Sequence, residues 1–320
     1  MHHKFLIVWA GGISILIAIL SGCGNNTQTV VSDPHHEITK ALLTKKWETK
    51  EVLQVVESVV YDPRKQIIYA SNVNSKVSGK VWGNNNGFIS KIDMNGNILS
   101  LHWAVGLQAP KGLALEGEHL YAADNNSIAD INTSNGKIIN IFKAPKGTNH
   151  LNDLSYDTDK HTLYASDEQN NQILKISKNG KFTLFYQIPP SKNTYLNGLL
   201  VDNGKLVIQG TKGFLKSIDL TTKKIHILSD TMEKVRMDGI QRYKEEGYLV
   251  SQVGENIYFV NKDGASKAFK IKHPTRVADI AYIPKLNLLL APNFKNKVIA
   301  YIPEIAVTKP DTNKTHTQKQ

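Results

Sequence analysis

The body of the chain alternates short apolar runs with turn-forming residues, and it contains no convincing amphipathic helix. Many runs alternate apolar and polar positions with a period of two, which predicts β-strands. Asn-Gly, Asp-Pro and other Gly-containing sequences separate the runs, as expected of tight turns. Over most of the 320 residues, this pattern predicts an all-β protein.

The runs recur as a repeat in which a polar or small pair precedes an aliphatic residue. The six pairs are Glu57-Ser58, Lys111-Gly112, Asn152-Asp153, Asn197-Gly198, Asp238-Gly239 and Ala278-Asp279. Each pair is followed by a second strand that ends in a polar residue. Four strands in each unit of about 40–45 residues are typical of a propeller blade. The sequence therefore predicts a six-bladed β-propeller.

The last unit lacks a fourth strand, because only a polar tail follows Val298–Ile302. The β-prone segment Trp47–Val55, upstream of the first unit, has a suitable length to supply that strand. Its pairing into blade six would close the ring and remove an exposed sheet edge. We therefore expect one propeller domain over residues 46–306, closed by an N-terminal strand, and a disordered tail over residues 307–320.

The N-terminus has the layout of a secretory signal. Lys4 precedes the mostly apolar run Phe5–Leu20, and small residues lead to Cys23, the only cysteine of the chain. The ending Leu20-Ser21-Gly22-Cys23 resembles the lipobox of bacterial lipoproteins, in which the cysteine is acylated and becomes the new N-terminus. An uncleaved membrane helix is the weaker interpretation, because the run is shorter than the ~20 residues that span a bilayer.

These features predict a signal peptide over residues 1–22, lipidation of Cys23 and a polar tether over residues 23–45. We expect the protein to be exported and anchored to the cell envelope, at the outer membrane in a Gram-negative host. The net charge of +11 comes from scattered lysines and not from a basic block with stacking aromatics. We therefore expect no nucleic-acid partner, and we expect a monomer.

The inner strand of each blade lines the central channel of a propeller, so the repeated polar residues should gather at one mouth of it. The residues of this ring are Glu57, Lys111, Asn152, Asn197 and Asp238. Carboxylate and amide oxygens, without sulfur or imidazole, suit a hard divalent cation. Calcium is the ion that we expect first, and magnesium, manganese and zinc are the alternatives. Simple turns would also explain Asn-Gly and Asp-Gly, but each pair here opens an apolar strand.

Other polar residues are expected near the same mouth. They end the second strands and are Asn72, Asp124, Asp167, Gln209 and Gln252. The long segment Val73–Asn86 should emerge on this face and form a lid that carries Trp82. His150 is also close to the mouth, and we expect it to be a solvated loop residue.

Six stretches carry a resemblance to a known family. They are Glu57-Ser-Val-Val-Tyr-Asp-Pro, Asn86-Gly-Phe-Ile-Ser-Lys, Leu151-Asn-Asp-Leu, Asn197-Gly-Leu, Asp238-Gly-Ile and Ala278-Asp-Ile-Ala-Tyr-Ile-Pro. The stretches that begin at Glu57, Leu151, Asn197 and Asp238 look like successive blades of the regucalcin (senescence marker protein), gluconolactonase and luciferin-regenerating-enzyme family. The other two are further matches, and the likeness is closest to the exported bacterial branch of that family. The resemblance implies that a divalent metal binds Glu57, Asn197 and Asp238, that Asn152 contacts metal or substrate, and that Asp238 is the catalytic base.

The resemblance also implies an activity, since enzymes of this family hydrolyse sugar lactones and related esters. The leading hypothesis is a metal-dependent, lactonase-like hydrolase of a small-molecule substrate, in which Asn152 and Lys111 orient that substrate. Lys111 departs from the family pattern, and the arginines that position sugar acids in the lactonases have no counterpart that the sequence identifies. The alternative is a non-catalytic propeller with a structural metal, which binds a ligand or a protein partner.

Overall fold

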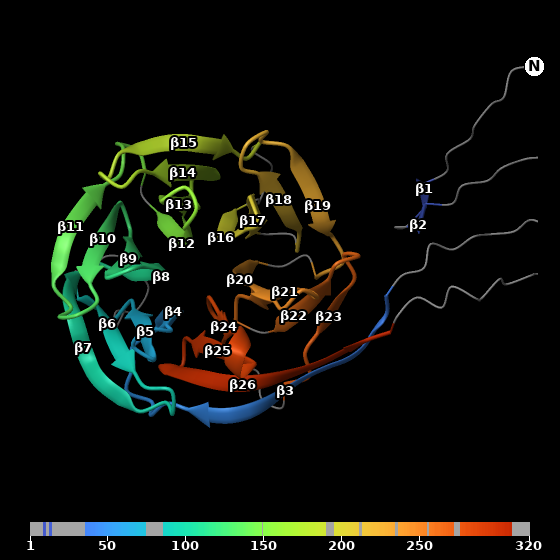
Figure 1. Cartoon of the computed structure of the whole chain (residues 1–320), viewed down its shortest axis with the longest axis horizontal. Coiled ribbons are helices and arrows are strands. Elements are labelled where there is room, and N and C mark those ends of the chain that lie inside the picture. Colours follow the sequence, from blue (N-terminus) through green and yellow to red (C-terminus); the bar gives the residue numbers. More distant parts are fainter. Residues whose placement is uncertain are drawn as a thin grey trace, which may run out of the picture. The chain divides into compact units, whose positions relative to one another are not determined.

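The computed structural model describes residues 9–10, 13–14, 36–74, 86–148, 150–189, 195–210, 213–233, 236–254, 256–271 and 276–308. Residues Ile38–Ala306 form one compact unit. Within it, six four-stranded sheets are arranged as a ring around a central channel (Figure 1). This confirms the predicted all-β, six-bladed propeller.

Each sheet is one blade, and its first strand lies innermost (Figure 1). Blade one contains β4 (Val56–Asp62), β5 (Ile67–Asn72), β6 (Gly87–Ile92) and β7 (Ile98–Leu107). Blade two contains β8 (Pro110–Glu116), β9 (His119–Asp124), β10 (Ser127–Asn132) and β11 (Ile138–Lys143). Blade three contains β12 (Leu151–Asp157), β13 (Thr162–Asp167), β14 (Gln172–Ile176) and β15 (Phe182–Gln187).

The remaining blades follow the same order. Blade four contains β16 (Leu196–Asp202), β17 (Lys205–Gly210), β18 (Leu215–Asp219) and β19 (Ile225–Ser229). Blade five contains β20 (Met237–Tyr243), β21 (Gly247–Gln252), β22 (Ile257–Asn261) and β23 (Ser266–Ala268). Blade six contains β24 (Ala281–Ile283), β25 (Leu288–Asn293), β26 (Lys297–Val307) and β3 (Ile38–Glu48), with the short 3-10 helix η1 (Pro284–Leu286) between β24 and β25.

Asp and Asn side chains close many of the turns between the third and fourth strands. In blade one, Asp93 Oδ1 accepts hydrogen bonds of 2.8 Å from the backbone N–H groups of Asn95 and Asn97. Gly96, in the same turn, has a φ of +83°, which suits glycine. Asn132, Asp219 and Asn261 accept equivalent bonds two residues ahead. These polar caps replace the backbone partners that the chain loses where it reverses.

The closing strand of blade six is β3 (Ile38–Glu48), and not the predicted segment Trp47–Val55. The predicted tether, residues 23–45, therefore overlaps the propeller from Ile38 onward. Most of Trp47–Val55 is an irregular link instead, because only its first two residues belong to β3. Val55 has a positive φ of +50°, and its N–H donates to Asn296 Oδ1 at 2.9 Å. Leu53 packs into the core as part of this link.

The core lies between neighbouring blades, where the described residues form clusters of buried aliphatic and aromatic side chains. Inner strands are covered on both faces by the adjacent blades, so β12 is buried at nearly every position. The outer strand of the same blade, β15, has no fully buried residue. This difference explains why inner strands appear as continuous apolar runs while the outer strands carry many polar residues.

The second unit comprises Met1–Glu37 and Val307–Gln320. Its described part includes the short pair β1 (Trp9–Ala10) and β2 (Ile13–Ser14). Among the described residues, no helix is long and apolar enough to cross a membrane. Cys23 lies outside the described residues, so its lipidation remains a prediction.

Candidate functional site

The repeated pairs coincide with an interruption of the hydrogen-bonding register between the first two strands of each blade. In blade one, Val56 pairs with Asn72 and Val59 with Ala70, which leaves Glu57 and Ser58 without partners in β5. The same interruption occurs in blades two to five, and residues 278–280 interrupt blade six. Unpaired residues of this kind bend a strand and redirect its side chains. The motif is therefore a structural irregularity at the edge of the channel.

We call the first residues of the pairs the mouth residues and the second residues the waist residues, because each strand runs one step deeper from the first to the second. The mouth residues are Glu57, Lys111, Asn152, Asn197, Asp238 and Ala278. The waist residues are Ser58, Gly112, Asp153, Gly198, Gly239 and Asp279. Both sets start from equivalent positions, within the inner strands of blades one to five and just before β24 in blade six, so the propeller's rotation brings each set together around the axis.

Serine side chains on the second strands support three of these irregularities. The N–H groups of Ser58 and Asp153 each donate to a serine hydroxyl at 2.9 Å, from Ser71 and Ser166 respectively. Gly239 N–H donates to Ser251 Oγ at 2.8 Å. Each buried N–H that the interrupted sheet leaves without a carbonyl thereby obtains an acceptor.

Glycines occupy the waist where neighbouring blades come closest. A Cβ atom on Gly112 would lie 2.6 Å from Asp153 Cα in the next blade. A Cβ on Gly198 would overlap the Asp238 carbonyl oxygen, and one on Gly239 would overlap Asp279 Oδ1. Glycine is thus required by close packing at these three waist positions.

Two carboxylates influence each other at the mouth. Glu57 and Asp238 are 5% and 3% exposed. Burial raises the pKa of Glu57 to about 6, although Lys111 and Arg236 oppose the rise. Burial raises the pKa of Asp238 well above its usual value, and the nearby Glu57 charge raises it further. Like charges that are buried together favour uptake of a proton or a cation.

Glu168 connects several polar residues beside this pair. Its carboxylate accepts a hydrogen bond from Asn152 Nδ2 at 2.8 Å, and it forms ion-pair contacts with His150 Nε2 at 3.0 Å and with Arg236 at 2.5 Å. Burial pushes the pKa of Glu168 upward, but the hydrogen bond from His150 and the charge of Arg236 hold it below the usual value. The Glu168 carboxylate therefore links Asn152, His150 and Arg236, and its hydrogen bond holds the Asn152 side chain in one orientation.

Glu168 and Arg236 lie outside the repeated pairs and were not predicted from the sequence, and the expectation that His150 is a solvated loop residue is wrong. The His150 side chain is 12% exposed and pairs with Glu168, so it is not a solvated loop residue. Arg236 immediately precedes β20, and its side chain is 45% exposed. The available signal was positional, since Glu168 follows the polar end of β13 and Arg236 stands two residues before Asp238.

Lys111 is the one cationic mouth residue, and it is completely buried. Its Nζ donates to Asn125 Oδ1 at 3.1 Å. Burial lowers the pKa of Lys111, while the carboxylates of Glu57, Asp124 and Glu168 counteract this effect. The lysine therefore places a positive charge close to Glu57.

The polar residues at the ends of the second strands hold the loops that lead into the inner strands. Asn72 Oδ1 accepts from the Gln54 N–H at 2.8 Å, and Asp124 Oδ1 accepts from the Ala109 N–H at 2.6 Å. Gln209 does not belong to this set, because Gly210 is the residue paired with the start of its inner strand. Gln209 instead donates through Nε2 to the carbonyl oxygen of Asp238.

The oxygen atoms at the mouth fit a hard cation. Glu57 Oε2, Asn197 Oδ1 and Gln209 Oε1 are buried, and none of them has a hydrogen-bond partner. A buried acceptor without a partner costs about 1–3 kcal/mol, which a shared cation would offset. Among the described residues, no group of three or more His, Cys, Asp or Glu side chains has metal-binding geometry. An ion here would depend on two carboxylates with amide oxygens, the kind of donor set that calcium accepts.

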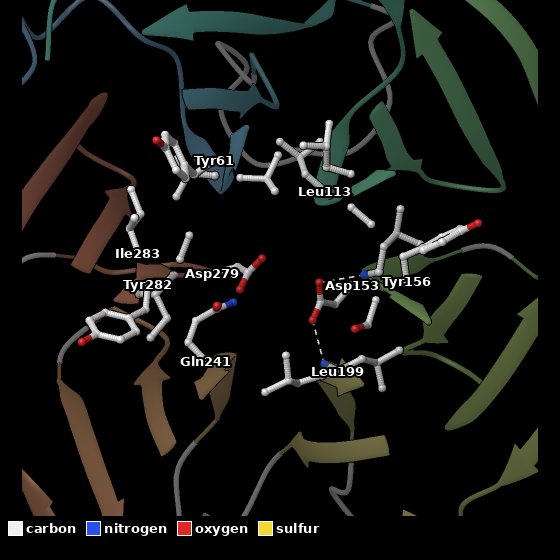
Figure 2. A pocket seen from close by; sticks show the side chains of 18 of the residues that line it. Tyr61, Leu113, Asp153, Tyr156, Leu199, Gln241, Asp279, Tyr282 and Ile283 are labelled. Carbon is white, nitrogen blue, oxygen red and sulfur yellow. Dashed lines mark hydrogen bonds between the residues drawn. The ribbon is translucent and has the colours of Figure 1, made fainter. Parts of the chain in front are cut away.

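The waist carries two further carboxyl groups, Asp153 and Asp279, which were not among the predicted site residues. Asp153 accepts hydrogen bonds of 2.7 Å from the N–H groups of Leu154 and Leu199, and Figure 2 shows it facing the channel. Asp279 Oδ2 accepts from Ser58 Oγ at 2.6 Å. Burial raises the pKa of Asp153 to about 7, and burial together with Asp153 raises that of Asp279.

The predicted lid, Val73–Asn86, lies mostly outside the described residues, and so does Trp82. Its role remains a prediction.

Comparison with known proteins shows the fold. No protein-family model matches the chain, and no curated protein matches it. A streptogramin B lyase structure matches with 14% identity and a TM-score of 0.63, covering 82% of this chain and 98% of the lyase. A catalytically inactive virginiamycin B lyase variant from Staphylococcus aureus, solved with quinupristin, matches with 16% identity and a TM-score of 0.58, covering 83% and 99%. Selenomethionine-substituted virginiamycin B lyase from Staphylococcus aureus matches with 15% identity and a TM-score of 0.56, covering 86% and 90%.

Proposed function

We propose that this propeller is a metal-dependent, lactonase-like hydrolase that acts on a small lactone or ester at the channel mouth. The observation that carries the proposal is the buried Glu57–Asp238 pair, together with the unpartnered oxygens of Glu57 and Asn197. Burying two carboxylates together destabilises the fold unless a cation is bound, and buried carboxylates with raised pKa values are common at catalytic sites. Glu57, Asn197 and Asp238 would hold the ion, with calcium as the first choice.

The chain's own residues divide the remaining tasks. A bound divalent ion would polarise a substrate carbonyl and acidify a water molecule. Asp238, buried beside Glu57, would accept the proton from that water. Asn152 is held by Glu168 and would orient the substrate together with Lys111.

Arg236 supplies a feature that the sequence resemblance did not provide. Nearly half of its side chain is exposed, and its charge acts on both Glu57 and Asp238. A guanidinium in this position suits a carboxylate or hydroxy-acid group of the substrate. We therefore favour anionic or acid-derived lactones over neutral ones.

One observation favours the alternative of a non-catalytic propeller that binds a ligand or protein partner. Lys111 is fully buried and close to Glu57, so its ammonium group can supply positive charge at the mouth without an ion. In that case the mouth would bind an anionic ligand directly. The two functions differ in their response to divalent ions, which makes them separable.

The decisive experiment measures melting and turnover of the same preparations. After treatment with a chelator, calcium, manganese or magnesium should raise the melting temperature of the wild type, and Asp238→Ala should remove this response. Stabilisation of about 2.7 kcal/mol is expected at a hundredfold excess of ion over Kd. Asp230→Asn, an exposed change away from the mouth, is the control and should respond like the wild type.

Turnover then decides between the two functions. Metal-loaded wild type should open a sugar lactone or cleave an aryl ester, whereas Asp238→Asn should lose this activity even if it retains the ion. Quinupristin belongs in the same panel, because a similar solved propeller contains it. Ion binding without turnover of any of these compounds would support the non-catalytic function, and no ion response at all would refute the metal site.

We also propose that the protein is lipid-anchored at the cell envelope through Cys23. The support is the sequence Leu20-Ser21-Gly22-Cys23 after an apolar run. Cys23→Ser should leave the precursor unprocessed and unlabelled by fatty acid. Normal processing and labelling of that variant would exclude the anchor.

A further inference from the structure

A cavity of about 520 Å³ occupies the channel on the other side of the waist. The later residues of the inner strands line it, and none of the six mouth residues does. Asp153 and Asp279 mark its inner limit. Its volume lies within the range of roughly 300–1,000 Å³ that is usual for small-molecule sites. The channel thus contains a second compartment, separate from the candidate catalytic mouth.

The walls of this cavity are mainly apolar. Figure 2 shows Leu113, Leu199 and Ile283 from three different blades around it. Tyr61 and Tyr156 stand toward the ends of their strands, at the outer part of the cavity. A ligand body of hydrocarbon or aromatic character would gain from contact with these side chains.

The inner end of the cavity carries two carboxyl groups. Asp153 is 5% exposed and faces Asp279 across the channel, with Gln241 beside Asp279 (Figure 2). Each carboxylate can accept about four hydrogen bonds. The described contacts supply two backbone N–H donors to Asp153 and one hydroxyl to Asp279. Acceptor capacity therefore remains at this end.

The only cationic side chain among the described lining residues is Lys285. It is exposed and lies in η1, beyond the end of β24, and thus far along the strand from Asp279. The inner carboxylates therefore have no basic partner within the cavity wall. An anionic ligand would be repelled there, and a purely apolar ligand would dehydrate the carboxylates without replacing their hydrogen bonds.

We propose that this cavity is a binding site for a small organic ammonium compound, whose charged nitrogen meets Asp153 and Asp279 and whose apolar body lies along the wall. An ammonium group has three N–H donors and can bridge the two carboxylates. A bare metal ion would gain nothing from the mainly apolar wall, whereas the body of an organic ammonium compound would. The site is independent of the activity proposed for the mouth.

The proposal is tested with three probes of equal length and different charge: hexylammonium, hexanol and hexanoate. Binding is measured by calorimetry on the full chain in chelator, at about pH 8, where alkylammonium ions keep their charge. We expect hexylammonium to bind one site and to bind at least about tenfold more tightly than hexanol, as a charge-assisted hydrogen bond would provide. Hexanoate should not bind.

Two variants locate the site. Asp279→Asn keeps an oxygen that can accept from Ser58 but removes the charge, and it should weaken hexylammonium about tenfold. Val60→Phe enlarges a half-buried residue that lines the cavity, and it should block the probe without altering either carboxylate. Asp230→Asn is again the control. If Asp279→Asn fails to fold, as judged by its melting curve, Val60→Phe decides the question.

Two results would overturn the proposal. One is hexylammonium binding no more tightly than hexanol, which would indicate that the cavity is a water-filled channel without an ammonium site. The other is ammonium binding that survives Val60→Phe but is displaced by calcium, which would assign the probe to the mouth.

Discussion

The innermost and outermost strands of the propeller differ in how uniform they are in length and in strand pairing. Five inner strands are seven residues long and share the same two-residue interruption. The outer strands range from three residues in β23 to 11 in β3, and they expose aliphatic side chains such as Ile141 and Ile227. Six inner strands must share one narrow axis, so each constrains its neighbours. An outer strand meets solvent on one side and has more freedom.

Removal of β3 is the strongest test of this comparison, because β3 is an outer strand that the ring needs. A chain that begins at residue 49 loses the buried side chains Ile38, Ala41 and Leu43 and exposes the edge of β26. We expect a loss on the order of 5 kcal/mol, a third or more of the stability of an ordinary domain. Chemical unfolding measures it. A chain that begins at residue 36 is the control, and equal stability of the two chains would contradict the assigned closure.

Gly198→Ala tests how tightly the inner strands pack at the waist. The added methyl group would overlap the Asp238 carbonyl oxygen and crowd the Gln209 side chain. Overpacking of this kind should cost about 3 kcal/mol in unfolding free energy. Gly204→Ala is a useful comparison, since its Cβ would meet nothing within 4 Å and only its φ of +73° opposes the change. If Gly198→Ala is no worse than Gly204→Ala, the waist is looser than described.

The buried carboxylates of the inner edge should make the metal-free protein less stable as the pH rises. The pKa of Glu57 rises from 4.5 to about 6 on folding, so the folded state holds this proton more tightly than the unfolded state does. Its contribution is present below about pH 4.5 and is lost as the pH passes about 6, which amounts to about 2 kcal/mol. Asp153, Asp238 and Asp279 act in the same direction.

Urea unfolding in chelator between about pH 4 and pH 8 measures this effect. Glu57→Gln should flatten part of the profile, and a saturating divalent ion should restore stability at the higher pH. Stability that increases over this interval would show that the carboxylates are not buried together.

Ile227→Lys gives the smallest expected effect and defines the tolerance of the outer edge. Ile227 is 67% exposed on β19. The change should alter the unfolding free energy by no more than about 0.5 kcal/mol. A loss of 2 kcal/mol or more, measured by chemical unfolding, would indicate that this outer strand is covered by another surface in solution.

The inner strands were also the part of the fold that could be predicted from the sequence. Their polar and glycine pairs recur because each copy solves the same packing problem, and the repeat located Glu57, Asn152, Asn197 and Asp238 at equivalent positions. Asp153 and Asp279 were not singled out, because their equivalents in other blades are serine or glycine. Glu168 and Arg236 reach the mouth from loops, where no periodic pattern applies.

The closing strand was misplaced for a physical reason. In β3, Ile38, Ala41 and Leu43 are buried, but the strand does not alternate strictly. Ile38, Ala41 and Leu42 are spaced like one face of a helical turn, and the lysines that follow suggest a tether. An outer strand with solvent on one side needs few apolar residues, so its pattern is weak. The more hydrophobic link before β4 was selected in its place.

The pairing of β3 with β26 also sets the order in which the blades can form during synthesis. Blades one to five each consist of one continuous stretch of chain, and each can form as soon as that stretch has been synthesised. Blade six needs the two ends of the body, whose contact requires closure of a very long loop. Until β26 has been synthesised, β3 has no partner strand in blade six. The ring therefore closes only after β26 has been made, and a product truncated before β26 keeps an open ring with unpaired sheet edges that can aggregate.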